Sequence, residues 1–215
     1  MLEKINYQDA LSSWKFFNKN TFKGQITTDL VSTNQNFRMF FVKTRDNDEF
    51  RVYTPAQNLE NVKISQGDFI MVNGEVHSWD RPIFDRDKQK TIISTFARSI
   101  VPITKQNCME DENHNQVVLV GTIRRDPFIS RNRDEEVVTG TLLGIKDTKR
   151  DRAYQIPVEF YDEQADIVKN TCAYGDRIAI NGKLKTREFP KKLSNGTCVK
   201  WISTEVAVKE MQILR

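Results

Sequence analysis

An all-β fold made of two similar halves is predicted by three observations on this sequence of 215 residues. The pattern G-D-x-I-x-x-N-G occurs at residues 67–74 and again at 175–182. The shorter pattern G-x-I-x-x-D occurs at 24–29 and 121–126. Around both copies, alternating runs typical of strands come first, then a segment of helical character, then further alternating runs. Such an internal repeat indicates that one supersecondary plan is used twice.

The order of elements in each half is that of a five-stranded OB barrel, which has a short helix before its fourth strand. The helical segments lie at 56–65 and 162–171. We therefore predict two tandem OB folds, over residues 21–104 and 116–215, joined by a polar and acidic linker at 105–115. Each half is about 100 residues long, which is enough to bury a small core.

The first 20 residues predict an amphipathic helix that precedes the first barrel. Their apolar side chains recur at roughly helical spacing: Leu2, Ile5, Leu11, Trp14 and Phe17. This helix has two candidate roles, packing against the barrel or an interface, and docking a partner.

Each predicted strand is an apolar run bounded by turn-forming residues. In the first half these runs span 22–29, 37–44, 49–54, 69–79 and 91–101. In the second half they span 116–125, 137–146, 153–161, 177–189 and 199–213. Three phenylalanines within these runs are expected in the core: Phe40, Phe69 and Phe96.

The composition limits the function. The 33 Lys and Arg residues against 29 Asp and Glu give a net charge of +4, a mild basicity that fits a polyanionic partner. The three cysteines show no CxxC spacing, so neither a disulfide framework nor a zinc site is expected. With two histidines and no Walker A, HExxH or G-x-S-x-G motif, we expect no catalysis and no cofactor. No apolar run reaches the length of a membrane span, and we expect a cytoplasmic protein.

Four motifs follow one another in the second half. They are N-Q-V-V-L-V-G-T-I at 115–123 with D-P after it, Y-Q-I-P-V-E-F at 154–160, G-D-R-I-A-I-N-G-K-L-K-T-R-E-F at 175–189 and S-T-E-V-A-V at 203–208. In this order and spacing they resemble the bacterial single-stranded DNA-binding protein family, and Tyr154 and Phe189 stand where that family has tryptophans. The resemblance implies OB folds that bind single-stranded DNA. Because the family assembles four OB folds, a chain with two of them is expected to form a homodimer.

The resemblance also concerns the end of the chain. The family carries a flexible acidic tail that recruits replication and repair enzymes, whereas this sequence ends at Arg215, directly after the last predicted strand. We therefore expect a specialised setting, such as a plasmid, a phage or a transfer element.

A sequence-nonspecific binder of single strands needs cations for the phosphates and flat rings for the bases on one face. Strand alternation places four residues after Gly182 on one polar face: Lys183, Lys185, Arg187 and Phe189. The corresponding residues after Gly74 are Glu75, His77, Trp79 and Arg81. We expect stacking by Trp79, Tyr154 and Phe189, the alternative being that these rings pack in an interface.

Further candidates surround this face. The loop between the second and third strands supplies Lys149, Arg150 and Arg152, where the resembling family wraps nucleic acid; the alternative is pairing with neighbouring acids. Phe160 and Trp201 are candidate stacking rings that are equally compatible with burial. Lys191 and Lys192 add positive charge near a turn at Asn195-Gly196.

The sequence therefore predicts single-stranded DNA binding in replication, repair or transfer of DNA, carried chiefly by the second barrel. The expected partners are single-stranded DNA, a second copy of the chain, and replication or repair proteins. The alternative is an OB-fold interaction module of a replication or primosome assembly with little DNA binding of its own, because OB folds carry out both functions.

Overall fold

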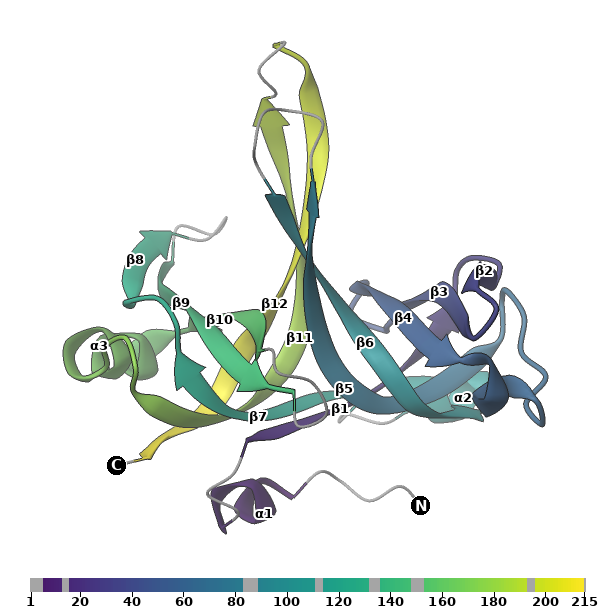
Figure 1. The fold of residues 1–215 in the computed structure, drawn as a ribbon, viewed down its shortest axis with the longest axis horizontal. Helices are drawn as coiled ribbons and strands as arrows, with labels where there is room; N and C mark the ends of the chain where they lie inside the picture. Colours follow the sequence, from purple (N-terminus) through teal and green to yellow (C-terminus); the bar gives the residue numbers. More distant parts are fainter. Residues whose placement is uncertain are drawn as a thin grey trace.

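A computed structural model describes residues 6–12, 16–82, 89–110, 114–131, 136–147, 153–192 and 196–214 (Figure 1). The predicted all-β class is confirmed, since most described residues lie in strands. None of the described helices is long and apolar enough to cross a membrane.

The strands of the first half pair in a circuit that returns to its start. The elements are β1 (Phe17–Ile26), β2 (Val31–Asn34), β3 (Phe37–Lys43), β4 (Glu49–Pro55), the 3-10 helix η1 (Ala56–Leu59), β5 (Phe69–Pro82) and β6 (Gln89–Pro102). β1 pairs with β3, β3 with β4, β4 in parallel with β6, β6 with β5, and β5 with β1. The short strand β2 adds to the outer side of β3.

The second half repeats this circuit. Its elements are β7 (Asn115–Ile123), β8 (Phe128–Arg131), β9 (Val137–Lys146), β10 (Ala153–Phe160), α3 (Asp162–Thr171), β11 (Arg177–Lys192) and β12 (Cys198–Leu214). β7 pairs with β9, β9 with β10, β10 in parallel with β12, β12 with β11, and β11 with β7. The ten predicted strands are confirmed and, β1 apart, their ends differ from prediction by three residues or fewer. α3 spans the predicted residues, whereas β2 and β8 were not predicted.

The helix predicted over the first 20 residues is wrong in extent. Within the described residues the helix α1 spans Tyr7–Ser12, and the chain already enters β1 at Phe17, because residues 17–22 pair with β7 of the other half. Tyr7 and Leu11 pack on a small buried cluster of β7 and β11, and the Tyr7 hydroxyl donates to the carbonyl of Ala179 at 3.1 Å. Burial and the nearby charge of Glu210 raise the pKa of that hydroxyl to about 12. Trp14 lies outside the described residues.

The segment predicted as a polar linker contains a short helix, α2, over Lys105–Met109. The side chain of Thr104 caps it by accepting from the amide of Asn107 at 3.1 Å, and Cys108 is its buried residue. A short surface helix with one buried side chain leaves little apolar pattern, which explains why the sequence suggested irregular structure.

The two halves join through an antiparallel ladder between β1 and β7, so that all the described strands belong to one sheet. Asn20 pairs with Val117, and these residues occupy equivalent positions, each four residues before the glycine that opens the G-x-I-x-x-D motif. A pseudo-two-fold axis therefore passes through this pair. Apart from the small cluster under α1, the buried apolar side chains of the two halves form one continuous cluster.

The same pseudo-symmetry governs a second set of contacts between the halves. The hydroxyl of Ser78 on β5 accepts from the amide of Gln155 on β10 at 2.8 Å. At the equivalent position on β11, the amide and the hydroxyl of Thr186 donate to one carboxylate oxygen of Asp48, at 2.6 and 2.8 Å. Thus β5 of the first half contacts the second half, and β11 of the second half contacts the first.

The last glycine of the repeated octapeptide is required by a close approach of two backbones. Both β5 and β11 change register there, between Asn73 and Gly74 and between Asn181 and Gly182. A Cβ atom on either glycine would lie 2.3 Å from a carbonyl oxygen of the neighbouring strand. The repeat therefore preserves a bulge that leaves no room for a side chain.

We predict that Gly74→Ala lowers the free energy of unfolding by about 1–3 kcal/mol, because the methyl group forces the strands apart at the bulge. Ser99→Ala is the matched control, since Ser99 is exposed on β6 and pairs with the residue beside the bulge. Urea unfolding of the two variants measures the difference. Equal midpoints would contradict the assignment of the glycine to close packing.

Candidate nucleic-acid interface

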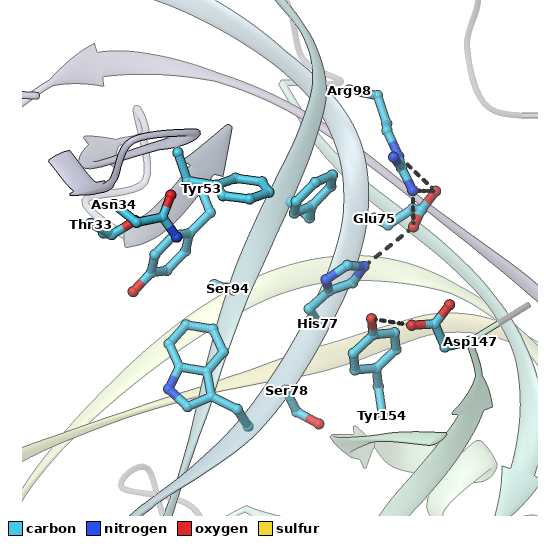
Figure 2. Close-up of a pocket in the computed structure, with 13 residues that line it drawn as sticks. Thr33, Asn34, Tyr53, Glu75, His77, Ser78, Ser94, Arg98, Asp147 and Tyr154 are labelled. Carbon is cyan, nitrogen blue, oxygen red and sulfur yellow. Dashed lines mark hydrogen bonds and ion pairs between the residues drawn. The ribbon is translucent and has the colours of Figure 1, made fainter. Parts of the chain in front are cut away.

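Aromatic side chains gather in one cavity of about 450 Å³ on the first half, which we call the aromatic groove (Figure 2). β3 to β6 form most of it, and β10 of the second half closes one side. Six of its lining residues carry rings: Phe37, Tyr53, His77, Trp79, Phe96 and Tyr154.

Strand alternation explains why these rings share a face. On β5, Glu75, His77 and Trp79 line the groove, as the sequence predicted, while Val76, between Glu75 and His77, is fully buried. On β6, Ser94, Phe96 and Arg98 line the groove in the same way. Side chains two residues apart lie on the same side of a strand, and the parallel pairing of Tyr53 with Phe96 brings β4 into line with them.

Three of the rings form a stack that spans both halves. Phe96 lies 5.1 Å from His77 with an interplanar angle of 14°, and His77 lies 4.1 Å from Tyr154 with an angle of 11°. Trp79 meets Tyr53 edge to face, with ring centroids 5.2 Å apart. The groove therefore has both stacked and upright rings around its open space.

Two opposite charges of the aromatic groove, Glu75 and Arg98, are paired with each other. Arg98 donates to both carboxylate oxygens of Glu75 at 3.0 Å, and His77 lies 3.3 Å from the same carboxylate (Figure 2). The hydrogen bond with His77, aided by the charge of Arg98, holds the pKa of Glu75 below its ordinary value despite burial. Glu75 therefore stays ionised and neutralises Arg98. The guanidinium of Arg51 lies 5.9 Å from the Trp79 ring.

The equivalent surface of the second half is charged. Register gives the correspondence: Tyr53 and Glu75 both pair with Phe96 in the first half, and Glu159 and Lys183 both pair with Ala207 in the second. Tyr53 is therefore replaced by Glu159, Glu75 by Lys183, His77 by Lys185, Trp79 by Arg187, Ser94 by Glu205 and Phe96 by Ala207.

This second cavity, of about 520 Å³, is called the charged groove, and acids outnumber bases in it. Its carboxylates belong to Asp46, Asp48, Glu159, Glu188 and Glu205, and its cations to Lys183, Lys185 and Arg187. The predicted common face of the three cations is confirmed, but that face is not basic, because β10, β12 and the turn after β3 bring acids to it.

Its cations are engaged within the protein. Lys183 lies 3.5 Å from Asp46, and Arg187 pairs with Glu159 at 3.1 Å and donates to the carbonyl of Arg131 at 3.3 Å. The charges of His114 and Lys183 lower the pKa of Asp46 against the opposing effect of burial. Phosphate binding at Lys183 and Arg187 would have to compete with these ion pairs.

Two carboxyl groups share the floor of the charged groove. Glu159 and Glu205 are both buried, and Glu159 also accepts from the Tyr161 hydroxyl at 3.0 Å. Burial first, and then the neighbouring Glu159, raise the pKa of Glu205 to about 8. The raised pKa favours the protonated form of Glu205, which can donate to the Glu159 carboxylate instead of repelling it.

The structure corrects two predicted stacking rings. Phe160 is fully buried, because it continues the inward phase of Ile156 and Val158 on β10, so its assignment to nucleic-acid binding is wrong. Tyr154 is 4 % exposed, has one face against His77 and donates to Asp147 at 2.8 Å. It belongs to the wall of the aromatic groove and does not present a free ring.

The other predicted residues lie as follows. Trp79 is half-buried in the aromatic groove, while Trp201 is half-buried on β12, opposite Phe189. Lys185 lies 5.9 Å from the Tyr161 ring, and Lys192 is exposed at the end of β11. Several predicted side chains are outside the described residues: Arg81, Lys149, Arg150, Arg152, Phe189 and Lys191.

Three rings of the aromatic groove were not predicted: Phe37, Tyr53 and Phe96. Phe96 was expected in the core, as was Phe40, but only Phe40 is fully buried. Strand alternation on β6 could have indicated that Phe96 is not in the core. Its neighbours Thr95 and Ala97 are buried, so Phe96 points to the opposite face of the strand, toward the groove.

Comparison with known proteins agrees with this architecture. Residues 114–214 match the model of the Single-strand binding protein family. A deletion mutant of the single-stranded DNA binding protein from Thermus aquaticus matches with a TM-score of 0.67 and 18% identity, over 94% of this chain and 96% of that one. The wild-type protein from the same organism matches with a TM-score of 0.65 and 16% identity, over 94% of each chain. The chain thus shares their fold over nearly its whole length.

We predict that stability falls as the pH rises from about 5 to about 8, because the folded protein keeps a proton on Glu205 that the unfolded chain has released. The contribution is complete below the ordinary pKa of 4.5 and is lost toward the folded value of about 8. Glu205→Gln cannot ionise, so its free energy of unfolding should fall less over this range.

Urea unfolding at several pH values compares this variant with Glu188→Gln, which removes a more exposed carboxylate paired with Lys200 at 2.6 Å. The control should follow the wild-type profile. Parallel profiles for the wild type and Glu205→Gln would show that Glu205 is ionised in the folded protein.

Proposed function

We propose that the protein binds single-stranded DNA without sequence preference, by stacking bases in the aromatic groove, and that it has no catalytic role. The observation that carries this proposal is the gathering of six rings in one cavity of about 450 Å³. A π face is common to all bases, so stacking tolerates any sequence. The family match of the second half and the shared fold support the same function.

We interpret each circuit of five strands as an OB barrel, and the chain as a member of the family that its second half matches. In this interpretation β3 and β4 are the second and third strands of the first barrel, and β5 and β6 form its last hairpin. OB folds bind oligonucleotides on these strands and on the adjoining loops. The aromatic groove lies on this surface.

The two halves contribute differently in this proposal. The sequence predicts that the second barrel carries most of the affinity, but five of the six rings belong to the first half, and Lys183 and Arg187 of the second half are paired with acids. We therefore assign base stacking to the first half. In the aromatic groove Arg98 is neutralised by Glu75, so phosphates are only weakly attracted there. The rings therefore supply the larger share of the binding energy.

The neutralised charged groove favours a second role for the second half, as a surface that docks proteins of replication, repair or DNA transfer. Mixed charges engaged in ion pairs discriminate between protein partners better than they attract a polyanion. A homodimer with four OB folds and a cytoplasmic location complete the proposal, on the resemblance described above.

We predict that Trp79→Ala lowers the affinity for an oligo-dT strand by about 1–3 kcal/mol, roughly 5- to 150-fold, because a base loses its stacking surface. Trp79→Phe should retain part of the affinity. Phe128→Ala is the matched control, since that ring is 38 % exposed on β8, away from the groove. Fluorescence anisotropy with a labelled strand measures all three, and thermal melting confirms that they are folded.

The assignment of halves is tested in the same assay with Lys185→Gln, which removes an exposed cation of the charged groove. We expect a smaller loss than for Trp79→Ala. A larger loss for Lys185→Gln would return the main binding role to the second half. Undiminished affinity in Trp79→Ala would remove the aromatic groove as the stacking site.

A further inference from the structure

We propose that the bound strand continues from the aromatic groove into a second subsite at the junction of the halves, where Lys19 and Lys146 hold its phosphates. This inference rests on the proposed function and extends it to residues of β1 and β9. The subsite is a cavity of about 450 Å³, which we call the seam cavity.

The seam cavity adjoins the aromatic groove directly. Glu75, Arg98, Asp147 and Tyr154 line both cavities, so one row of side chains separates them. In Figure 2 these four residues lie on the side of His77 away from Tyr53. A chain of nucleotides that leaves the rings on this side therefore meets the seam cavity next.

The separating row carries two acids, Glu75 and Asp147, and one base, Arg98. Glu75 is bound by Arg98 through two hydrogen bonds, and Asp147 accepts from the Tyr154 hydroxyl at 2.8 Å. With two formal negative charges and one positive charge, the row does not itself attract a polyanion. The row thus permits passage of the strand without supplying much affinity.

Beyond the row the charge becomes positive. Lys19 and Lys146 line the seam cavity and are exposed, and neither has a carboxylate partner within the described part of the chain. Lys19 lies 5.1 Å from the ring of Phe17, which also lines the cavity. The charged groove differs in this respect, because Lys183 and Arg187 are held there by acids.

A ring with two available ammonium groups is the combination that one or two nucleotides require. Lysine acts on phosphate as a point charge and reads no base, which agrees with binding that ignores sequence. The two cations come from different halves, since Lys19 lies on β1 and Lys146 ends β9. The β1–β7 ladder brings these strands together, so the subsite belongs to the junction and to neither half alone.

The length of the strand decides whether this subsite is used. A strand of about 4 nucleotides can fill the aromatic groove alone, whereas one of about 16 nucleotides can also reach the lysines. Each phosphate neutralised on a single strand adds about 0.7 to the dependence of log K on log salt. Two lysines should therefore account for about 1.4 of that slope, for long strands only.

The test is salt titration of binding for the full chain carrying Lys19→Gln and Lys146→Gln, with short and long oligo-dT. We expect a slope lower than the wild type by about 1.4 with the long strand and no change with the short one. The matched control carries Lys63→Gln and Lys105→Gln, which remove the same charge from exposed positions outside both cavities. Because the four lysines are exposed, both double variants should keep the wild-type melting temperature.

An unchanged slope with the long strand, or an equal reduction in the control variant, would overturn the subsite. An equal reduction of the slope with short and long strands would also overturn it. The lysines would then act on a strand in the aromatic groove by long-range electrostatic attraction and not by direct contact. Failure of the proposed function is recognised separately. In that case Trp79→Ala binds the short strand as tightly as the wild type, whatever the lysine variants do.

Discussion

The antiparallel ladder between β1 and β7 is the interaction on which the other features of the structure depend. It places Asn20 opposite Val117 and thereby sets the two halves around a pseudo-two-fold axis. From this arrangement β5 comes to lie beside β10, and β11 beside the turn that follows β3. The wall that Tyr154 gives to the aromatic groove and the ion pair of Lys183 with Asp46 are both consequences of it.

The halves share a backbone plan and differ in what they present on it. The bulge glycine occurs in both, because the neighbouring carbonyl leaves no space for a Cβ atom in either. Outward positions carry no such constraint, and rings in the first half correspond to acids and bases in the second. Buried carboxyl groups such as Glu159 and Glu205 cost desolvation free energy, which Arg187, Tyr161 and a shared proton offset.

The sequence predicted the strands, α3 and the alternation on β5 and β11, since these follow from local periodicity. It missed β2 and β8, whose four residues each are mostly exposed and show no pattern. It extended the first helix too far, because the strand character of residues 17–20 comes from pairing with β7, a partner distant in sequence.

The candidate site was harder to predict than the fold. The ring of Tyr53 reaches the groove through a parallel pairing of β4 with β6, which no local pattern reveals. The sign of charge on the face of Lys183, Lys185 and Arg187 depends on acids from three other segments. A pattern on one strand predicts which residues share a face, whereas the character of that face depends on every segment that adjoins it.

Joining the halves in one chain also removes a restriction that acts on pairs of identical subunits. In a true two-fold dimer every substitution appears at two sites, so a ring gained on one face is gained on both. In this chain the two equivalent positions carry different residues, Trp79 in the first half and Arg187 in the second. The molecule consequently has two distinguishable ends. A polymer with a chemical direction of its own, laid across such a surface, meets different contacts when it is turned around.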